Sequence, residues 1–351
     1  MKSKRLGIPI FGMISGADMI RKITFLCNWK ETQNPFRNFA VEEYLMHHVE
    51  EGEIVFFLWQ DRNTVVIGRN QNGWRECDVK RLEEDGGLLA RRLSGGGAVY
   101  HDIGNMNFSF LARKKDYDVD RQLSVIMDGL SPFGIHAEKS GRNDIKIDGR
   151  KFSGNAFYRT GDYCYHHGTL LISEDMKDMM KYLNVDGSKM NYKGVKSVPS
   201  KVVNLSDLNG AITVESLTEA LKESFGKVSG LPVHEIRSSD IPEEALEERI
   251  RFFSSWDWRL GQAREFSTSI EGRYDWGFIR LYFGVNRGKI EKASVDSDGL
   301  EADLIASLPG VLKGSRYEGS ALAEALSSLP VETAEERAVL SDVTELVREK
   351  A

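Results

Sequence analysis

Three consecutive glycines, residues 95–97, join two predicted strands, 87–93 and 98–101. Glycine allows positive φ angles and close approach of the backbone to a ligand. Successive N–H groups in such a turn form a concave site for an anion. Arg91 and Arg92, directly before the glycines, can add bidentate contacts to phosphate or carboxylate. The segment therefore predicts a site for a phosphorylated or acidic ligand; the alternative is a glycine-rich hairpin with solvated arginines.

The loop matches neither of the two common phosphate-binding motifs. No Gly-Lys-Ser/Thr ending follows it, so it is not a Walker A sequence, and no Gly-x-Gly-x-x-Gly opens a helix here. Polar residues do follow it, namely His101, Asp102 and Asn107. Their presence beside the arginines favours a binding site over a plain hairpin.

The second informative segment is a predicted β-hairpin over residues 144–153. Asp148-Gly149 between alternating residues is a strong signal for a two-residue turn. The resulting register pairs Ile147 with Arg150 and Lys146 with Lys151, and places Asp144 opposite Ser153. Because side chains alternate between faces, one polar face is predicted to carry Asp144, Lys146, Lys151 and Ser153.

Two lysines opposite each other on this face repel unless an anion or Asp144 lies between them. The face could therefore hold a phosphate, with Asp144 available to Mg²⁺, which prefers carboxylate and phosphate oxygens. The alternative is an ordinary amphipathic hairpin that faces solvent.

His166 and His167 are adjacent on a predicted strand and point to opposite faces, so they do not form a metal pair, and no further zinc ligands cluster with them. The simplest interpretation is one packed and one surface histidine. The three cysteines, Cys27, Cys77 and Cys164, are widely spaced, which predicts free thiols.

The remaining pattern predicts an α+β chain with many antiparallel connections rather than a regular βαβ alternation. Its 351 residues suit two domains. We predict an N-terminal extension over residues 1–22, a catalytic domain over 23–245 and an accessory domain over 246–351. In the last unit we expect hairpin strands over 274–283 and 289–295, and two or three helices after Gly310.

Charge and hydropathy narrow the classes of partner. The net charge of −6 argues against nucleic acid, and no apolar run is long enough to span a bilayer. The first 22 residues are basic and poor in acids, which leaves an organelle leader open, although a dispensable extension is the simpler interpretation. We expect a monomer in the cytoplasm.

In combination, these segments resemble the lipoate–protein ligase family in order and spacing. The resemblance rests on residues 65–72, 91–107, 141–144, 151–154, 166–171, 193–195 and 197–205, and it extends to 254–266 in the second unit. It implies a catalytic domain with the biotin/lipoate ligase-like fold, in which mixed, largely antiparallel sheets are flanked by helices. It also implies a small α+β accessory domain.

The resemblance implies a two-step reaction. Lipoate and ATP give lipoyl-AMP and pyrophosphate, and the lipoyl group then passes to the ε-amino group of a carrier lysine. The implied carriers are lipoyl domains of 2-oxoacid dehydrogenase acyltransferase subunits and the glycine-cleavage carrier protein. Mg²⁺ is the implied metal, and octanoate is an open alternative to lipoate.

The resemblance also assigns residues. Lys151 is the expected catalytic residue, in contact with both the lipoate carboxyl and the α-phosphate, and Asp144 is the expected Mg²⁺ ligand. The expected ATP site comprises Arg92, Gly97, Ala98, Val99, Tyr100, Asn143, Asp144 and Lys151. The expected lipoate site comprises Arg91, Gly95, Gly96, His101, Lys151 and His167.

Three rival functions remain. A lipoyltransferase would use preformed lipoyl-AMP without making it, but such relatives alter the segment that corresponds to residues 141–144, which is Gly-Arg-Asn-Asp here. A cysteine-dependent octanoyl transferase would need Cys164. A non-catalytic lipoate or nucleotide sensor would not need Lys151 and Arg92.

Overall fold

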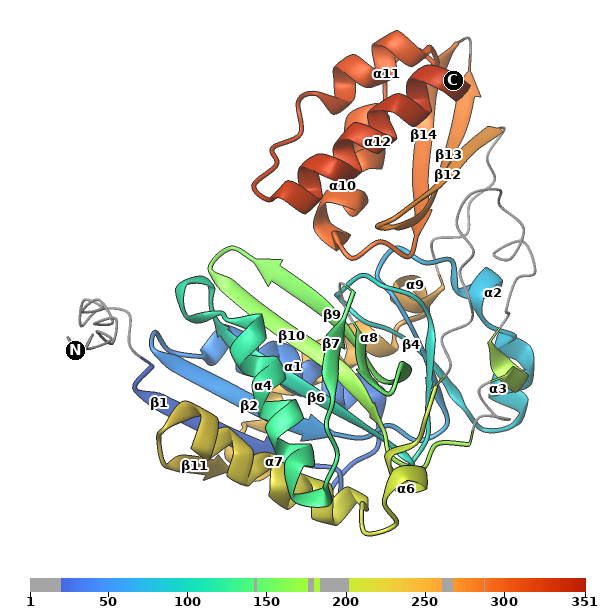
Figure 1. Ribbon diagram of the computed structural model, residues 1–351. Helices are drawn as coiled ribbons and strands as arrows, with labels where there is room; N and C mark the ends of the chain where they lie inside the picture. The colour runs from blue at the N-terminus through green and yellow to red at the C-terminus, as the bar shows by residue number, and fades with distance from the viewer. Residues whose placement is uncertain (1–19, 142–143, 176–179, 184–201, 261–267, 287) are drawn as a thin grey trace, which may run out of the picture.

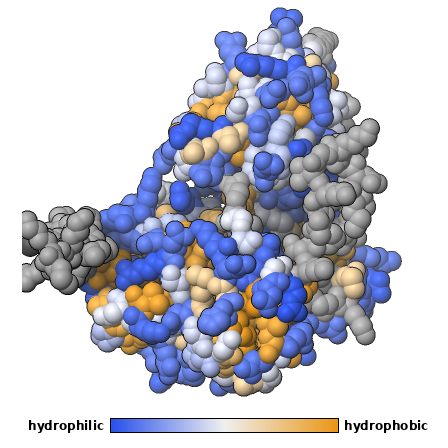
Figure 2. Space-filling view, viewed as in Figure 1, coloured by the Kyte–Doolittle hydropathy of each residue, from blue (hydrophilic) through white to orange (hydrophobic). Residues whose placement is uncertain are grey.

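The computed structural model describes residues 20–141, 144–175, 180–183, 202–260, 268–286 and 288–351. Figure 1 shows a larger unit built around a long twisted sheet and a smaller unit in which three helices cover one face of a short sheet. On the face drawn in Figure 2, hydrophilic residues cover most of both units, and apolar residues appear only in small separate groups. None of the described helices is both long and apolar enough to cross a membrane.

The main sheet has eight strands in the order β11-β1-β2-β6-β10-β9-β8-β7. β1 runs parallel to β2 and β11, and the other neighbours are antiparallel. The strands are β1 Lys22–Cys27, β2 Glu53–Trp59, β6 Asn105–Arg113, β7 Glu138–Ser140, β8 Asp144–Ile147, β9 Arg150–Thr160, β10 Tyr163–Leu171 and β11 Val233–Ile236.

Helices bury both faces of this sheet, which explains why β2 and β6 are buried at nearly every position. α4 (Val119–Leu130) and α7 (Val214–Ser229) cover one face, where Phe56, Phe110 and Phe225 pack together. α1 (Pro35–His48) and α8 (Glu243–Ser254) cover the other, around Phe39 and Phe253.

A second sheet, in the order β4-β3-β5, carries the three-glycine loop. β3 is Thr64–Ile67, β4 is Leu88–Arg91 and β5 is Val99–His101, so the loop joins β4 to β5. Two short helices follow β3, α2 (Gly73–Glu76) and α3 (Val79–Glu84). They are separate because the side chain of Asp78 caps the start of α3.

The β8–β9 hairpin confirms the predicted turn and corrects the predicted register. Asp148 and Gly149 have φ angles of 49° and 73°, as a two-residue turn of this kind requires. Lys146 does pair with Lys151, but Ile145 pairs with Ser153 and Asp144 with Gly154. The prediction that Asp144 faces Ser153 is therefore wrong.

The physical reason is a β-bulge: Phe152 is an extra residue on β9, and its side chain is fully buried in the core. The bulge moves Lys151 from the face of Ser153 to the face of Gly154 and Ala156. This change of face is what turns Lys151 toward the cavity described below.

The smaller unit has one three-stranded antiparallel sheet, β12 (Thr268–Tyr274), β13 (Gly277–Asn286) and β14 (Lys289–Ser297). The strand predicted over 274–283 therefore contains a turn. Three helices follow, and the first begins before Gly310 rather than after it. They are α10 Ala302–Leu312, α11 Gly319–Leu326 and α12 Ala334–Lys350.

The domain boundary predicted between residues 245 and 246 falls inside α8. Leu246 and Phe253 of this helix lie in the same core as α1. α6 (Leu205–Leu208) and α9 (Trp256–Arg259) complete the larger unit, and α9 leads into residues 261–267, which lie outside the described part of the chain. The predicted extension also lies outside it, up to residue 19. The division into domains stays a prediction.

The two units meet where the segment after β3 contacts the end of β14 and the start of α10. Asp296 is almost fully buried there; it accepts a hydrogen bond from the backbone N–H of Asn72 and pairs with Arg75 at 3.0 Å. Asn70 donates to the carbonyl of Ala302 and accepts from the N–H of Ser297. Backbone groups of both units are therefore satisfied across the contact.

Arg91 ties this segment to the end of α9. Its guanidinium is almost completely buried and donates to five backbone carbonyls, at distances from 2.6 to 3.1 Å. Burial lowers the pKa of Arg91 to about 10. The accepting carbonyls belong to Gly68, Arg69, Gln71, Trp258 and Arg259.

We expect Arg91→Met to lower the free energy of unfolding by about 3 kcal/mol or more, because several buried carbonyls lose a charged donor. Chemical denaturation measures this loss. Arg81→Met, on the exposed side of α3, is the matched control and is expected to change stability by less than about 0.5 kcal/mol. Equal stabilities of the two variants would contradict a structural role for Arg91.

Candidate active site

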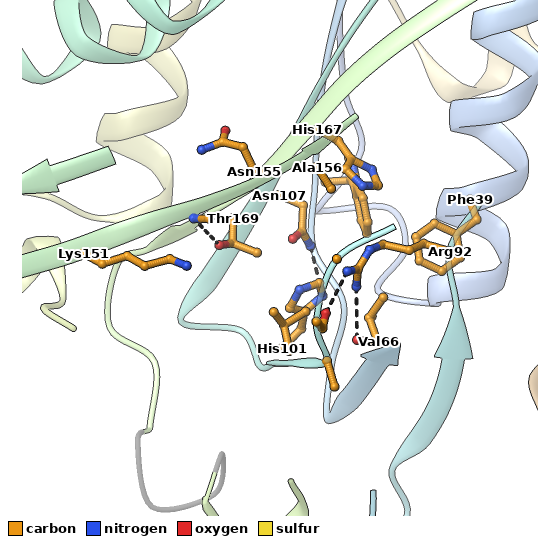
Figure 3. A pocket seen from close by; sticks show the side chains of 17 residues that line it. Phe39, Val66, Arg92, His101, Asn107, Lys151, Asn155, Ala156, His167 and Thr169 are labelled. Carbon is orange, nitrogen blue, oxygen red and sulfur yellow. Dashed lines mark hydrogen bonds between the residues drawn. The ribbon is translucent and has the colours of Figure 1, made fainter. Parts of the chain in front are cut away.

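A cavity of about 180 Å³ lies between the main sheet, α1 and the three-glycine loop. Figure 3 shows Lys151 on one side of it and Arg92 with Phe39 on the other, with His101 and Asn107 between them. The lining residues are Phe39, Trp59, Val66, Arg92, Gly96, Gly97, Ala98, Val99, His101, Asn107, Lys151, Gly154, Asn155, Ala156, His167, Gly168 and Thr169.

Arg92 supplies a buried positive charge. Its guanidinium donates to the carbonyls of Val66, Gly95 and Gly97, which fold the loop around it. Burial lowers the pKa of Arg92 to about 10. Among the described residues no carboxylate lies within ion-pair distance of it, so an anion entering the cavity would supply the missing counter-charge.

Lys151 supplies a second positive charge at the start of β9. Its Nζ lies 2.7 Å from Oδ1 of Asp144, and both side chains remain partly exposed. A side chain at position 154 would meet this Nζ at 3.0 Å, so Gly154 leaves the room that the lysine needs. Thr169 lies beside them and accepts a hydrogen bond from the N–H of Gly154.

His167 is fixed by a buried polar network. Its Nδ1 lies 2.9 Å from Oε1 of Glu42, and its Nε2 lies 2.7 Å from Oγ of Ser94. Glu42 also accepts from Ser109, which in turn accepts from the indole N–H of Trp59. Because a carboxylate only accepts, Nδ1 carries the hydrogen. The network therefore holds one ring orientation at the cavity wall.

His101 forms a different arrangement. Its Nδ1 lies 3.0 Å from Oδ2 of Asp61, and Asn38 donates to the other oxygen of that carboxylate at 2.9 Å. Asn107 approaches the same Nδ1 at 3.4 Å. The remaining nitrogen, Nε2, is buried and has no hydrogen-bond partner among the described residues.

The structure brings most of the predicted site residues to one cavity and leaves others outside it. Those that line it are Arg92, Gly96, Gly97, Ala98, Val99, His101, Lys151 and His167. Asp144 reaches it through its ion pair with Lys151. Asn143 lies outside the described residues, as do residues 193–195 of the resemblance.

Three predicted site residues do not line the cavity. The guanidinium of Arg91 is used entirely by backbone carbonyls, and Gly95 packs against residues 299 and 300 of the smaller unit. The side chain of Tyr100 lies in a separate core, and its hydroxyl donates to Asn63. The positions of these three residues do not favour direct contact with a ligand in the cavity.

The interpretation of the histidine pair as one packed and one surface residue is wrong, because both are buried. His166 points to the opposite face from His167, where it bonds to Gln122 and Asn155. Burial lowers the pKa of His166 to about 3, which keeps this ring neutral.

Sequence reasoning missed the apolar wall and the acids behind it, chiefly Trp59, Ala156, Glu42 and Asp61. One signal was available for Glu42. It follows Phe39 by three residues in a helix, so it lies on the apolar, inward face, where an acid needs a buried partner.

The three-glycine loop also touches the smaller unit. The N–H of Gly96 donates to the carbonyl of Gly299 at 3.2 Å. A Cβ at position 95 would lie 2.2 Å from that carbonyl oxygen, whereas one at position 97 would meet nothing within 4 Å. One side of the loop therefore contacts the cavity, and the other supports the smaller unit.

Two positive charges at a partly apolar cavity favour an anionic ligand with an apolar part. Comparison with known proteins agrees. Residues 34–226 match the model of the lipoyl protein ligase A/B catalytic domain, and residues 263–347 match the bacterial lipoate protein ligase C-terminus. The chain belongs to the lipoate–protein ligase family, and the predicted fold class is confirmed.

Solved structures agree with this assignment. LipL1 of P. falciparum, in complex with lipoate, is 30% identical; the match covers 94% of this chain and 99% of that one, with a TM-score of 0.80. A bipartite lipoate protein ligase from Thermoplasma acidophilum is 25% identical, covers 71% of this chain and all of its own, and has a TM-score of 0.58. A lipoate-protein ligase A bound with ATP, 22% identical, shares the fold over 69% of this chain and 99% of its own, with a TM-score of 0.57.

We expect Gly95→Ala to weaken the contact between the loop and the smaller unit, because its methyl group would overlap the Gly299 carbonyl. Thermal unfolding should show a loss of about 1–3 kcal/mol, as overpacking usually costs. Gly97→Ala is the matched control in the same loop and should be nearly neutral for stability. A Gly95→Ala protein as stable as this control would contradict the prediction, because the loop and the Gly299 carbonyl would then move apart without loss of stability.

Proposed function

We propose that this protein activates lipoate with ATP to give lipoyl-AMP and then transfers the lipoyl group to the ε-amino group of a carrier lysine. The observation that carries the proposal is the placement of Lys151 and Arg92 at one cavity, each a cation that an anionic ligand can neutralise. The ATP-bound relative is consistent with adenylation as the first step.

Lys151 would supply the cation that the first step needs. A carboxylate that attacks an α-phosphate must overcome repulsion between two anions, and a fixed cation between them stabilises the charge that develops. Because the N–H of Gly96 already donates to Gly299, the positive charge of Arg92 is the feature of this loop that we propose for the phosphates. Lys151 would also polarise the acyl carbonyl in the second step.

The cavity suits an acid with an extended apolar tail. The Nζ of Lys151 lies against Gly154, and Ala156, which also lines the cavity, follows two residues farther along β9, a span of roughly 7 Å. Phe39, Trp59 and Val66 form the apolar wall at the far side. We propose lipoate as the acid, as in the lipoate complex of the P. falciparum relative, with octanoate as a second substrate to be tested.

Asp144 is the residue that we propose for Mg²⁺. In the part of the chain that the structure describes, no three His, Cys, Asp or Glu side chains cluster as a metal site. That is compatible with Mg²⁺, which binds through one or two carboxylates together with substrate phosphates and water. Asp144 would then exchange Lys151 for the metal when nucleotide binds. When bound, the metal would neutralise phosphate charge.

We propose lipoyl domains as the carriers, which is the partner named for the Thermoplasma relative. A thioester route through Cys164 is disfavoured, because this thiol is fully buried and burial raises its pKa. The remaining alternatives, a lipoyltransferase without adenylation activity and a non-catalytic sensor, differ from the proposal in one assay: pyrophosphate exchange into ATP that depends on lipoate.

We expect Lys151→Met to abolish lipoate-dependent exchange of labelled pyrophosphate into ATP, a fall of about 10³-fold or more if both anions lose their shared cation. Lys146→Met is the matched control: Lys146 faces Lys151 across the hairpin but does not line the cavity. It should retain most of the exchange activity.

Near-normal exchange by Lys151→Met would sink the catalytic assignment. Transfer from added lipoyl-AMP without any exchange by the unmodified protein would instead identify a transferase. Binding of lipoate with neither activity would identify a sensor.

A further inference from the structure

The transfer step needs a proton acceptor. A carrier lysine has a pKa of about 10.4 and therefore arrives as an ammonium ion, which cannot attack a carbonyl until it loses a proton. The group that accepts this proton must be a base that is free when the lysine enters. This inference deepens the proposed function, because it concerns the second half of that reaction.

Four titratable side chains line the cavity among the described residues: Arg92, His101, Lys151 and His167. Arg92 is a permanent cation held by carbonyls, and Lys151 is paired with Asp144. Both ring nitrogens of His167 are engaged, with Ser94 and Glu42. Nε2 of His101 is the basic atom that has no partner in the described structure.

Asp61 sets the protonation pattern of His101. This carboxylate is fully buried, lies 3.0 Å from Nδ1 and is itself held by Asn38. Since the carboxylate accepts, Nδ1 of the neutral ring carries the hydrogen and Nε2 carries the lone pair. The same pair of groups also stabilises the ring once it has gained a proton, as a buried carboxylate does beside an imidazole base.

His101 is also placed within reach of the reacting atoms. Lys151 Nζ lies against Gly154 on β9, Thr169 lies beside Gly154 on β10, and Asn107 pairs with Thr169 on β6. Asn107 in turn contacts His101. Two strand spacings, roughly 10 Å, therefore separate Gly154, beside the Nζ of Lys151, from Asn107, which contacts His101. An acyl carbonyl and an incoming amine fit in that interval, which Figure 3 shows from the side of the cavity.

We propose that His101 is the general base of the transfer step and that Asp61 is its positioning residue. Nε2 accepts one proton from the carrier ammonium, and the freed lone pair forms the C–N bond. The acyl C–O bond then breaks with its electron pair passing to AMP, whose phosphate takes the second nitrogen proton. The products are the amide, AMP and a protonated His101, which later releases its proton to water.

The charged groups around His101 come from four elements. Asp61 follows β2 and contacts the ring directly, while Arg92 after β4, Lys151 on β9 and His167 on β10 face it across the cavity. Because a general base accepts a proton only in its unprotonated form, the transfer rate should rise with pH through an inflection that depends on the presence of His101.

The test is single-turnover transfer from preformed lipoyl-AMP to a purified apo lipoyl domain, measured over a range of pH. We expect His101→Gln to slow transfer by about 10²–10⁴-fold near neutral pH, to lose the inflection, and to recover partly at alkaline pH as the carrier lysine deprotonates unaided. Asp61→Asn should slow transfer and displace the inflection. His47→Gln, an exposed histidine of α1, is the matched control and should keep the normal profile.

A His101→Gln profile that runs parallel to that of the unmodified protein would overturn the proposal, because a residue that only binds or packs would lower the rate without changing its pH dependence. A profile of the unmodified protein without an inflection would also overturn it. If thermal unfolding shows that His101→Gln does not fold, Asp61→Asn decides the question. An unchanged inflection in Asp61→Asn would then overturn the proposal.

The two proposals fail separately in this design. Since lipoyl-AMP is supplied, a protein that cannot make it would fail the exchange assay, yet its transfer profile would still decide the role of His101. A protein that does not transfer at all overturns both.

Discussion

The buried guanidinium of Arg91 is the interaction on which the rest of the site depends. Five carbonyls, from the segment after β3 and from the end of α9, accept hydrogen bonds from this one cation. Arg91 therefore connects residues that are far apart in the chain. The segment after β3 contacts the smaller unit, and the three glycines begin four residues after Arg91. Arg91 therefore helps to fix the geometry of the cavity, although its own side chain does not line it.

Arg91 and Arg92 are neighbours in sequence, yet strand alternation gives them opposite roles. Arg91 is saturated by carbonyls of the structure. Arg92 faces the cavity, where its charge is balanced only by carbonyl dipoles and not by a carboxylate of the described residues. A buried cation without a counter-ion is costly, and the cost is recovered when an anionic ligand binds. The site is thus electrostatically prepared for its ligand before the ligand arrives.

Much of the fold and part of the site could be predicted from the sequence. The Asp148-Gly149 turn is a local signal, so it was predicted correctly, and the resemblance named eight residues that do line the cavity. The bulge at Phe152 could not be predicted, because it depends on how that ring packs in a core formed by distant strands. For the same reason, the partners of His101 and His167 come from α1 and the end of β2, far away in sequence.

The glycine loop contacts both the cavity and the smaller unit, and this limits which substitutions in the loop could change ligand specificity. Gly95 must stay without a side chain because of a carbonyl in the smaller unit, while Gly97 has open space around it. Position 95 can therefore vary only together with residues 299 and 300, whereas position 97 can vary alone. In natural or selected variants, position 95 should therefore covary with residues 299 and 300.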